Sequence, residues 1–380
     1  MRRFIFAALT ALTCAAPVSA ACDASNQFTF DWNSQPDAAL NYANTYNYTV
    51  TNALGATRNI QTRFTTNGLA TNAVAGFPMP VIAVVHTGAL ATTEKTLTIG
   101  GRLNARTAAI GGATNVMTVT FTFSTPVRDV GFRVFDVDFT NNSWRDWVKV
   151  TGSDGTTTYD AGLSKPAAST VKLGPNATAP AIAAAEALGT SANDLNQDIG
   201  TIVTTFAQPV TSVTLRYGNY PRQAGETTTG EQWLSIHDIS FCPMPSVTLS
   251  KSSTPYATSG PDRFNAPGSD VAYSLTVANS GGSPVDLASL VLSDTLPPNV
   301  TFYNGDFNAA SPGMGPFLLV AGSSGVTLPA SSAAYSQNGS TWSATASAGY
   351  DPLVRYIRLT PAGSLAANSS VTIRFRARIN

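Results

Sequence analysis

Short runs of alternating apolar and polar residues, rich in Thr, Val, Ile and Phe, recur along the first two thirds of this chain. Alternation with a period of two places successive side chains on opposite faces, so each run predicts a half-buried β-strand. Ten runs precede residue 243: QFTFDW, YNYTVT, NIQTRFTT, KTLTIGG, VMTVTFTFS, VRDVGFRVFDVDF, DWVKVTGS, TIVTTFAQ, VTSVTLRYG and LSIHDISF. Their number and the size of the region favour a jelly-roll-like β-sandwich over an Ig module.

Two stretches of this region, MTVTFTFSTPVRDVGFRVFDVD and GTIVTTFAQPVTSVTLRYGN, have the same arrangement of elements. Each has an apolar strand, a turn with Pro126 or Pro209, and a second strand that starts at Val130 or Val213. The pattern predicts two similar hairpins, as in the doubled layout of such sandwiches. The one exception to the strand pattern is an Ala-rich run at 179–189, which predicts one or two helical turns.

The first twenty residues have the features of a secretory leader. Arg2 and Arg3 form a short basic region, an apolar stretch follows, and small residues precede Ala21. This pattern predicts a signal peptide over 1–20 and a mature chain that is periplasmic, on the cell surface or extracellular. A lipoprotein leader would acylate Cys22, but Ser19 stands where that signal needs a large aliphatic residue. No later apolar segment has the length of a transmembrane helix.

Charge excludes two classes of partner. Charged residues make up 12% of the chain and its formal net charge is zero, whereas an average soluble protein has about 25% charged residues. Nucleic acids and anionic membranes are bound through basic patches. The composition therefore predicts neither partner.

Two cysteines, Cys22 and Cys242, remain after the leader is removed with Cys14. In an oxidising compartment they predict one disulfide that joins the two ends of the first domain. Such a long closed loop corresponds to stabilisation on the order of 5 kcal/mol in the chain-entropy model. The alternative is a pair of free, buried thiols.

A proline-containing break, CPMPSV, follows the last strand of the first region. Prolines favour an extended, poorly packed connection. We therefore expect a first domain over 21–242, a linker over 243–246 and a second domain over 247–380.

The second region contains DVAYSLTVANSGGSPVDLASLVLSDTLPPNVTF at 270–302 and GSLAANSSVTIRFRARI at 363–379. These segments resemble the conserved-repeat β-sandwich of bacterial envelope proteins, the domain of unknown function number eleven. The resemblance implies an Ig-like β-sandwich on an exported or surface protein, where it acts as a spacer or interaction module. Members of this family often carry the repeat in tandem, whereas this chain has one copy, so we do not expect a long stalk. Residues 304–350 fall outside the motif, and we expect them to form an inserted hairpin or long loops.

A possible metal site lies at the end of one predicted strand. Asp136 and Asp138 are two apart and so share a strand face, and Asp146 follows on the next loop. Carboxylate oxygens are ligands that suit calcium. The alternative is that these aspartates accept hydrogen bonds from the backbone or pair with arginines such as Arg145 or Arg216.

A possible binding surface combines aromatic and arginine side chains on two loops, at 140–147 and 216–233. Aromatic faces next to arginine and amide groups are suited to sugars. The alternative is that the tryptophans belong to the core. The candidate binding residues are Trp144, Arg145, Tyr220 and Arg222.

Catalytic motifs are not recognisable in the mature sequence. It has no Gly-x-Ser-x-Gly element and only two histidines, His86 and His237. On a regular strand His237 and its neighbour Asp238 would face opposite sides. The sequence also has no zinc-ligand spacing.

We therefore expect an exported, non-catalytic binding or structural protein of a bacterial envelope, with glycans or envelope proteins as partners and calcium as the one possible cofactor. The first alternative is a secreted hydrolase that acts on glycans with carboxylates from distant strands, for example Glu226 or Glu231. A second alternative is a fibre-forming protein that associates through exposed sheet edges.

Overall fold

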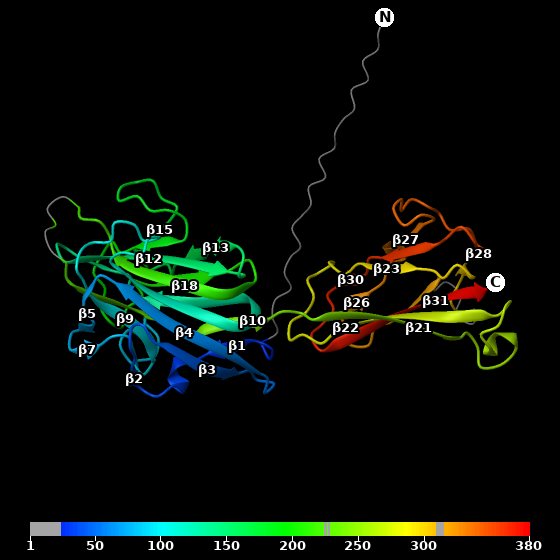
Figure 1. Cartoon of the computed structure of the whole chain (residues 1–380), viewed down its shortest axis with the longest axis horizontal. Helices are drawn as coiled ribbons and strands as arrows, with labels where there is room; N and C mark the ends of the chain where they lie inside the picture. Colours follow the sequence, from blue (N-terminus) through cyan, green and yellow to red (C-terminus); the bar gives the residue numbers. More distant parts are fainter. Residues whose placement is uncertain (1–23, 224–225, 227–228, 309–314) are drawn as a thin grey trace, which may run out of the picture. The chain divides into compact units, whose positions relative to one another are not determined.

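The computed structural model describes residues 24–223, 226, 229–308 and 315–380 (Figure 1). These residues form β-strands, three short 3-10 helices and loops, and they contain no α-helix. They fall into two compact units, one ending at Met244 and the other beginning at Pro245. The predicted fold class, all-β with a jelly-roll-like β-sandwich followed by an Ig-like β-sandwich, is confirmed. No helix in the described ranges is long and apolar enough to span a membrane.

One layer of the first unit is an antiparallel sheet that contains the first half of the longest strand, β10 (Val116–Phe135). On one side of β10 lie β4 and β3, and on the other side lie β18, β12, β16 and β15 in that order. Their bounds are β3 (Thr45–Thr51), β4 (Thr57–Asn67), β12 (Trp144–Ser153), β15 (Lys172–Leu173), β16 (Glu186–Leu188) and β18 (Val210–Asn219).

The other layer contains the second half of β10. On one side β10 pairs with β17, which pairs with β14; on the other side it pairs with β19 and β20. β19 pairs with β9, which also pairs with β5 and β8; β8 pairs with β2, and β20 pairs with β1. Their bounds are β1 (Phe28–Phe30), β2 (Ala38–Ala39), β5 (Leu69–Thr71), β8 (Val81–Ala83), β9 (Thr96–Leu103), β14 (Gly162–Ser164), β17 (Ile202–Thr205), β19 (Glu231–Ile236) and β20 (Ile239–Pro243).

Smaller elements complete this unit. β11 (Phe139–Thr140) and β13 (Thr158–Asp160) each pair with β12, and β6 (Ala73–Val74) pairs with β7 (Phe77–Pro78). The 3-10 helix η1 (Trp32–Ser34) follows β1.

The core of the first unit lies between the two layers. Phe121 and Phe132, one from each half of β10, approach with ring centroids 6.4 Å apart. Phe123 contacts Phe241 of β20 in the same way, at 5.0 Å. These contacts bury the apolar faces of the alternating strands, which is the main stabilising contribution that such a sandwich has.

The two predicted hairpins are wrong. Residues 116–135 form one continuous strand whose register shifts between Thr122 and Val127, around Pro126. The second stretch behaves similarly, because β17 pairs with one half of β10 and β18 with the other. Both prolines therefore mark places where the chain passes from one layer to the other. A proline without an N–H group suits such a corner, since a ladder hydrogen bond is interrupted there.

The Ala-rich run at 179–189 also differs from its prediction. It contains the short strand β16 and no helical turn. Ile182 and Leu188 are buried in a small cluster with Trp147. Tertiary contacts therefore outweigh the helix propensity of alanine here.

The two units meet at the predicted linker region, but Pro243 is the last residue of β20. Cys242 is buried in the same strand and is disulfide-bonded. Cys22 lies outside the described residues, as does the predicted leader over 1–20. The pairing of Cys22 with Cys242 stays a prediction.

The second unit has one larger sheet, in which the order is β21, β22, β31, β24 and β28, and β25 also pairs with β31. A smaller sheet has the order β23, β29 and β27, and β26 pairs with β30. Their bounds are β21 (Val247–Pro255), β22 (Asp270–Asn279), β23 (Leu292–Thr295), β24 (Val300–Asn304), β25 (Phe317–Val320), β26 (Val326–Thr327), β27 (Ala333–Ser336), β28 (Gly349–Asp351), β29 (Tyr356–Leu359), β30 (Ala362–Gly363) and β31 (Ser369–Ile379).

The strands that carry the family resemblance are β22 and β31, and the whole of β22 pairs with residues 369–378 of β31 in the larger sheet. Phe302, Ile357 and Phe375 are among the fully buried residues of this core. The region 304–350 contributes β25, β26 and β27 in addition to loops, so it is more than one inserted hairpin.

Candidate functional site

The two loops that the sequence singled out lie side by side. The amide of Gly230 donates a hydrogen bond to the carbonyl oxygen of Ser143 (2.9 Å), and the amide of Tyr220 donates to the carbonyl oxygen of Arg145 (2.9 Å). A Cβ atom on Gly230 would lie 2.0 Å from Oγ of Ser143 and 2.9 Å from the ring of Trp144. The turn after β11 and the loop before β19 therefore form one surface, and the close approach explains a glycine at residue 230.

Two of the predicted binding residues make their main contacts with the protein itself. The indole N–H of Trp144 donates a 2.7 Å hydrogen bond to Oδ1 of Asp138. The hydroxyl group of Tyr220 donates to the carbonyl oxygen of Ala181 (2.8 Å), and its ring packs edge-on against Trp147 (4.9 Å between centroids). Both side chains are half-buried. They hold the loops in place and leave part of their surface to solvent.

The two predicted arginines differ in their surroundings. The guanidinium group of Arg145 stacks on Phe139 at 3.8 Å and lies 3.7 Å from Oε1 of Glu226. Arg106 approaches Oε2 of the same carboxylate at 3.5 Å. Burial lowers the pKa of both guanidinium groups, and the charge of Glu226 opposes this shift. Arg222, in contrast, is exposed.

A cluster of three buried carboxyl groups lies beneath these loops. Asp136, Asp138 and Asp146 are 4%, 5% and 0% exposed. β10 ends at Phe135, and Asp136 has a φ of 66°. The regular strand therefore stops before the aspartates, and the predicted sharing of one strand face does not apply. The chain's turn, and not strand alternation, brings these side chains together.

Each of the six carboxylate oxygens has a protein nitrogen or hydroxyl group within 3.3 Å. Trp144 Nε1 and the amide of Asn193 approach Asp138. Tyr217 Oη and the amide of Asp138 donate to Asp146. The remaining two contacts join Asp136 to Asn193 Nδ2 and His86 Nε2.

Burial, and to a smaller extent the neighbouring charge of Asp136, together raise the pKa of the Asp138 carboxyl to about 6. Burial likewise raises the pKa of Asp146 well above its usual range, as it does for the Tyr217 hydroxyl. Low-polarity surroundings disfavour the charged form of each group. The surroundings therefore favour the protonated forms of Asp138 and Asp146.

Calcium binding at this cluster stays a prediction. Three residues can hold one metal ion when each offers a ligand atom and these atoms lie within 4.8 Å of one another. Among the described residues, the carboxylate oxygens of Asp136, Asp138 and Asp146 do not meet this condition. An ion would also have to displace hydrogen-bond donors from five of the six carboxylate oxygens. Two of the six contacts are backbone hydrogen bonds, as in the alternative reading. The other four come from side chains of Trp144, Asn193, Tyr217 and His86, and none of the six involves Arg145 or Arg216.

A groove of about 620 Å³ lies next to the aromatic pair formed by Trp147 and Tyr220. Its lining residues are Trp147, Pro175, Asn176, Ala177, Ala181, Ile182, Ala183 and Glu186. Most of these residues are apolar and several are small, and the larger Trp147 and Ile182 are mostly buried at its edge.

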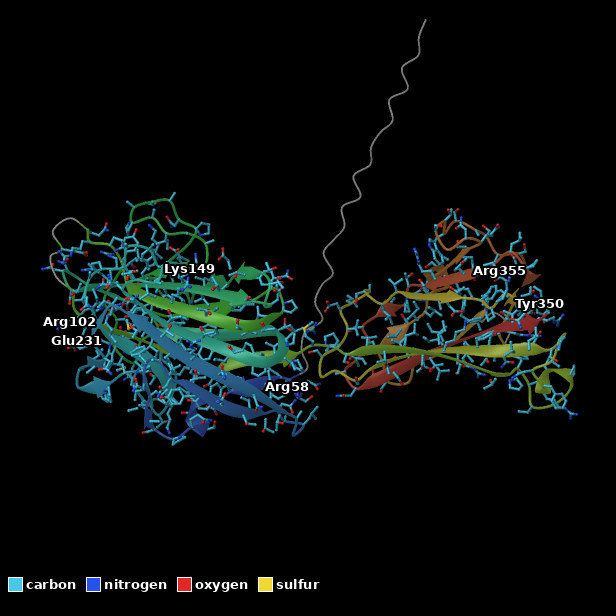
Figure 2. All side chains as sticks on the ribbon, viewed as in Figure 1. Arg58, Arg102, Lys149, Glu231, Tyr350 and Arg355 are labelled. Atoms are coloured by element: carbon cyan, nitrogen blue, oxygen red, sulfur yellow. The ribbon has the colours of Figure 1, made fainter. Side chains whose placement is uncertain are left out.

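Glu186 supplies the charge in this groove, and its orientation is fixed. Its Oε2 accepts hydrogen bonds from Trp147 Nε1 (3.0 Å) and from the amide of Ala183 (3.1 Å). Its Oε1 lies 3.5 Å from Nζ of Lys149 on β12 (Figure 2). No local pattern indicated a role for Glu186, because the surrounding Ala-rich run resembled a helix. Only the pairing of β16 with β12 places it beside Trp147.

No family model matches this chain, and neither does any curated protein. Two solved structures of discoidin II from Dictyostelium discoideum are similar to it at 9% sequence identity. The wild-type structure covers 84% of this chain and 94% of its own, with a TM-score of 0.25. The native recombinant structure covers 84% and 96%, with a TM-score of 0.26.

Proposed function

We propose that this chain is an exported, non-catalytic protein whose first unit binds carbohydrate in the groove beside Trp147. The observation that carries the proposal is the combination, in one groove, of an aromatic ring and an immobilised carboxylate, Glu186. Sugar rings pack their C–H faces on aromatic side chains and direct hydroxyl groups to a few fixed polar partners.

The charge around the groove supports a neutral, hydroxyl-rich ligand. Lys149 lies against Glu186 and partly neutralises it, so neither sign of charge dominates. The chain has no net charge. A strongly anionic or cationic ligand would gain little from long-range attraction here.

The contacts of the other carboxylates favour binding over hydrolysis. Glycoside hydrolysis needs two carboxyl groups on opposite sides of the scissile bond. Glu186 is the one carboxylate among the residues that line this groove. Glu226 and the three aspartates are not among those residues, and Glu226 lies between two arginines. The alternative of a secreted glycan hydrolase has less support for this reason.

The second unit would present the first or dock it to an envelope protein. Its resemblance to the conserved-repeat family supports this role, and the leader at 1–20 supports export to the periplasm, cell surface or medium. Of the four predicted binding residues, Tyr220 contacts the groove lining, through Trp147 and Ala181, and would extend the binding surface. Trp144, Arg145 and Arg222 are not among the residues that line the groove.

A glycan array probed with the mature chain, 21–380, tests the proposal. Ala177→Arg places a long charged side chain in the groove and should reduce binding at least tenfold. Ala53→Arg, at an exposed alanine in the turn between β3 and β4, is the matched control and should bind normally. Equal binding by both variants, no glycan ligand, or hydrolysis of a bound glycan would contradict the proposal.

A further inference from the structure

A second cluster of potential metal ligands lies away from the groove. Glu94 is in the loop before β9, and His237 and Asp238 connect β19 to β20. Their side chains offer one carboxylate oxygen, one imidazole nitrogen and one further carboxylate oxygen, all within 4.8 Å of one another. Within the described ranges, no other group of three such residues meets this condition.

The local backbone explains why His237 and Asp238 converge. The sequence pattern predicted that they face opposite sides of one strand, and this prediction is wrong. β19 ends at Ile236 and β20 begins at Ile239. The two residues between them are not part of either ladder, so the alternation of side chains is interrupted. Nε2 of His237 lies 2.9 Å from Oε1 of Glu94 and 3.9 Å from Oδ2 of Asp238.

Neighbouring groups fix both carboxylates. Nδ2 of Asn33 donates to Oε1 of Glu94 (2.9 Å), and the amide of Trp32 donates to Oδ1 of Asp238 (3.0 Å). Both donors belong to η1, whose first turn is capped by Asp31 through a 2.7 Å hydrogen bond from the amide of Asn33. Such supporting hydrogen bonds orient metal ligands and reduce the ordering that binding requires.

The imidazole ring is also held in place. The ring of Phe135 packs against it with centroids 5.4 Å apart. The side chains of Glu94, His237 and Asp238 are 16%, 17% and 19% exposed. They are thus ordered by packing and still accessible to an ion from solvent.

We propose that Glu94, His237 and Asp238 form a binding site for a divalent transition metal, with zinc as the natural occupant. Zinc ligands lie about 2.0–2.2 Å from the ion in tetrahedral sites, so neighbouring ligand atoms are roughly 3.3 Å apart. The separations of 2.9 and 3.9 Å lie on either side of this value. A small adjustment of either carboxylate would produce the required geometry.

The ligand types select the metal. Imidazole favours zinc and other transition metals, whereas calcium prefers oxygen ligands alone. Three protein ligands leave a fourth position for water or for a group of a bound partner. The site is independent of the proposed carbohydrate groove, and either proposal can fail without the other.

Isothermal titration of tag-free mature protein with zinc, after removal of metals by a chelator, tests this proposal. One equivalent should bind. His237→Asn and Glu94→Gln should each weaken binding at least tenfold. Glu231→Gln, which changes an exposed glutamate at the far end of β19 (Figure 2), is the matched control and should leave binding unchanged.

Cobalt substitution gives a second readout that does not depend on the stability of a variant. Tetrahedral or five-coordinate Co²⁺ bound by the unaltered protein should produce visible absorption bands, and added zinc should remove them. An ion pair between His237 and Glu94 without metal affinity is the competing outcome. Absence of stoichiometric zinc binding, or equal affinity in His237→Asn and the control, would overturn the proposal.

Discussion

The hydroxyl group of Tyr217 donates a 2.5 Å hydrogen bond to Oδ1 of Asp146, and neither residue is exposed to solvent. The bond links β18 to β12, which are neighbours in one layer of the first unit. The amide of Asp138 occupies the other oxygen of Asp146, and Asp138 in turn accepts from Trp144. A buried polar network therefore supports the loop surface from below, and such networks are costly to disrupt in part.

Removing the hydroxyl group in Tyr217→Phe should lower the free energy of unfolding by about 1–3 kcal/mol, because a buried carboxyl oxygen would lose its partner. Urea unfolding measures this loss. Tyr159→Phe is the matched control, since Tyr159 donates a hydrogen bond of the same length to Asp154 at the surface. The control should lose much less stability. Equal losses would show that the buried network has no special role.

The raised pKa of Asp138 predicts a dependence of stability on pH. Its folded-state pKa of about 6 lies above the usual value of 3.8, so folding favours the protonated form. The resulting stability is present below about pH 4 and is lost as the pH rises through about 6, with an upper limit of roughly 3 kcal/mol.

Asp138→Asn cannot ionise and should show a smaller decline in stability between pH 4 and pH 6 than the unaltered protein. Urea unfolding at several pH values in this range compares the two slopes. Ser293→Ala, at an exposed position in the second unit, should retain the original slope. Identical slopes for Asp138→Asn and the unaltered protein would assign the pH dependence to other groups.

The disulfide prediction concerns Cys242, whose buried sulfur is disulfide-bonded, and Cys22, outside the described residues. Exported protein should gain 2 Da on reduction and expose two alkylatable thiols only then. Replacing both cysteines by serine should lower stability by up to about 5 kcal/mol. Two thiols that react without reductant would contradict the pairing.

Gly189 should not tolerate a side chain. A Cβ atom there would lie 1.8 Å from the backbone oxygen of Asp138. Gly189→Ala must therefore shift backbone beside the aspartate cluster, and we expect a loss of at least about 2 kcal/mol in thermal or urea unfolding. Gly111→Ala is the control, because a Cβ atom at Gly111 meets nothing within 4 Å. A stable Gly189→Ala variant would show that this close approach is easily relieved.

Local sequence patterns were sufficient for the fold class and for several of the longer strands. A period of two is a local property, and loop residues such as Gly and Asn stop strands wherever they occur. The alternation in 116–135 correctly predicted strand. Trp144, expected on a loop, is instead the first residue of β12, and the sequence left open whether the two aromatic segments are neighbours.

Tertiary structure decided which strands pair and which side chains meet. Pro126 marks a corner of one strand because β4 and β18 flank its first half while β17, β19 and β20 flank its second. Glu186 reaches Trp147 only through the pairing of β16 with β12. Glu94 and His237 are 143 residues apart in sequence. No local pattern encodes such contacts, because they depend on the free energy of burying whole sheet faces against each other, which distant segments contribute together.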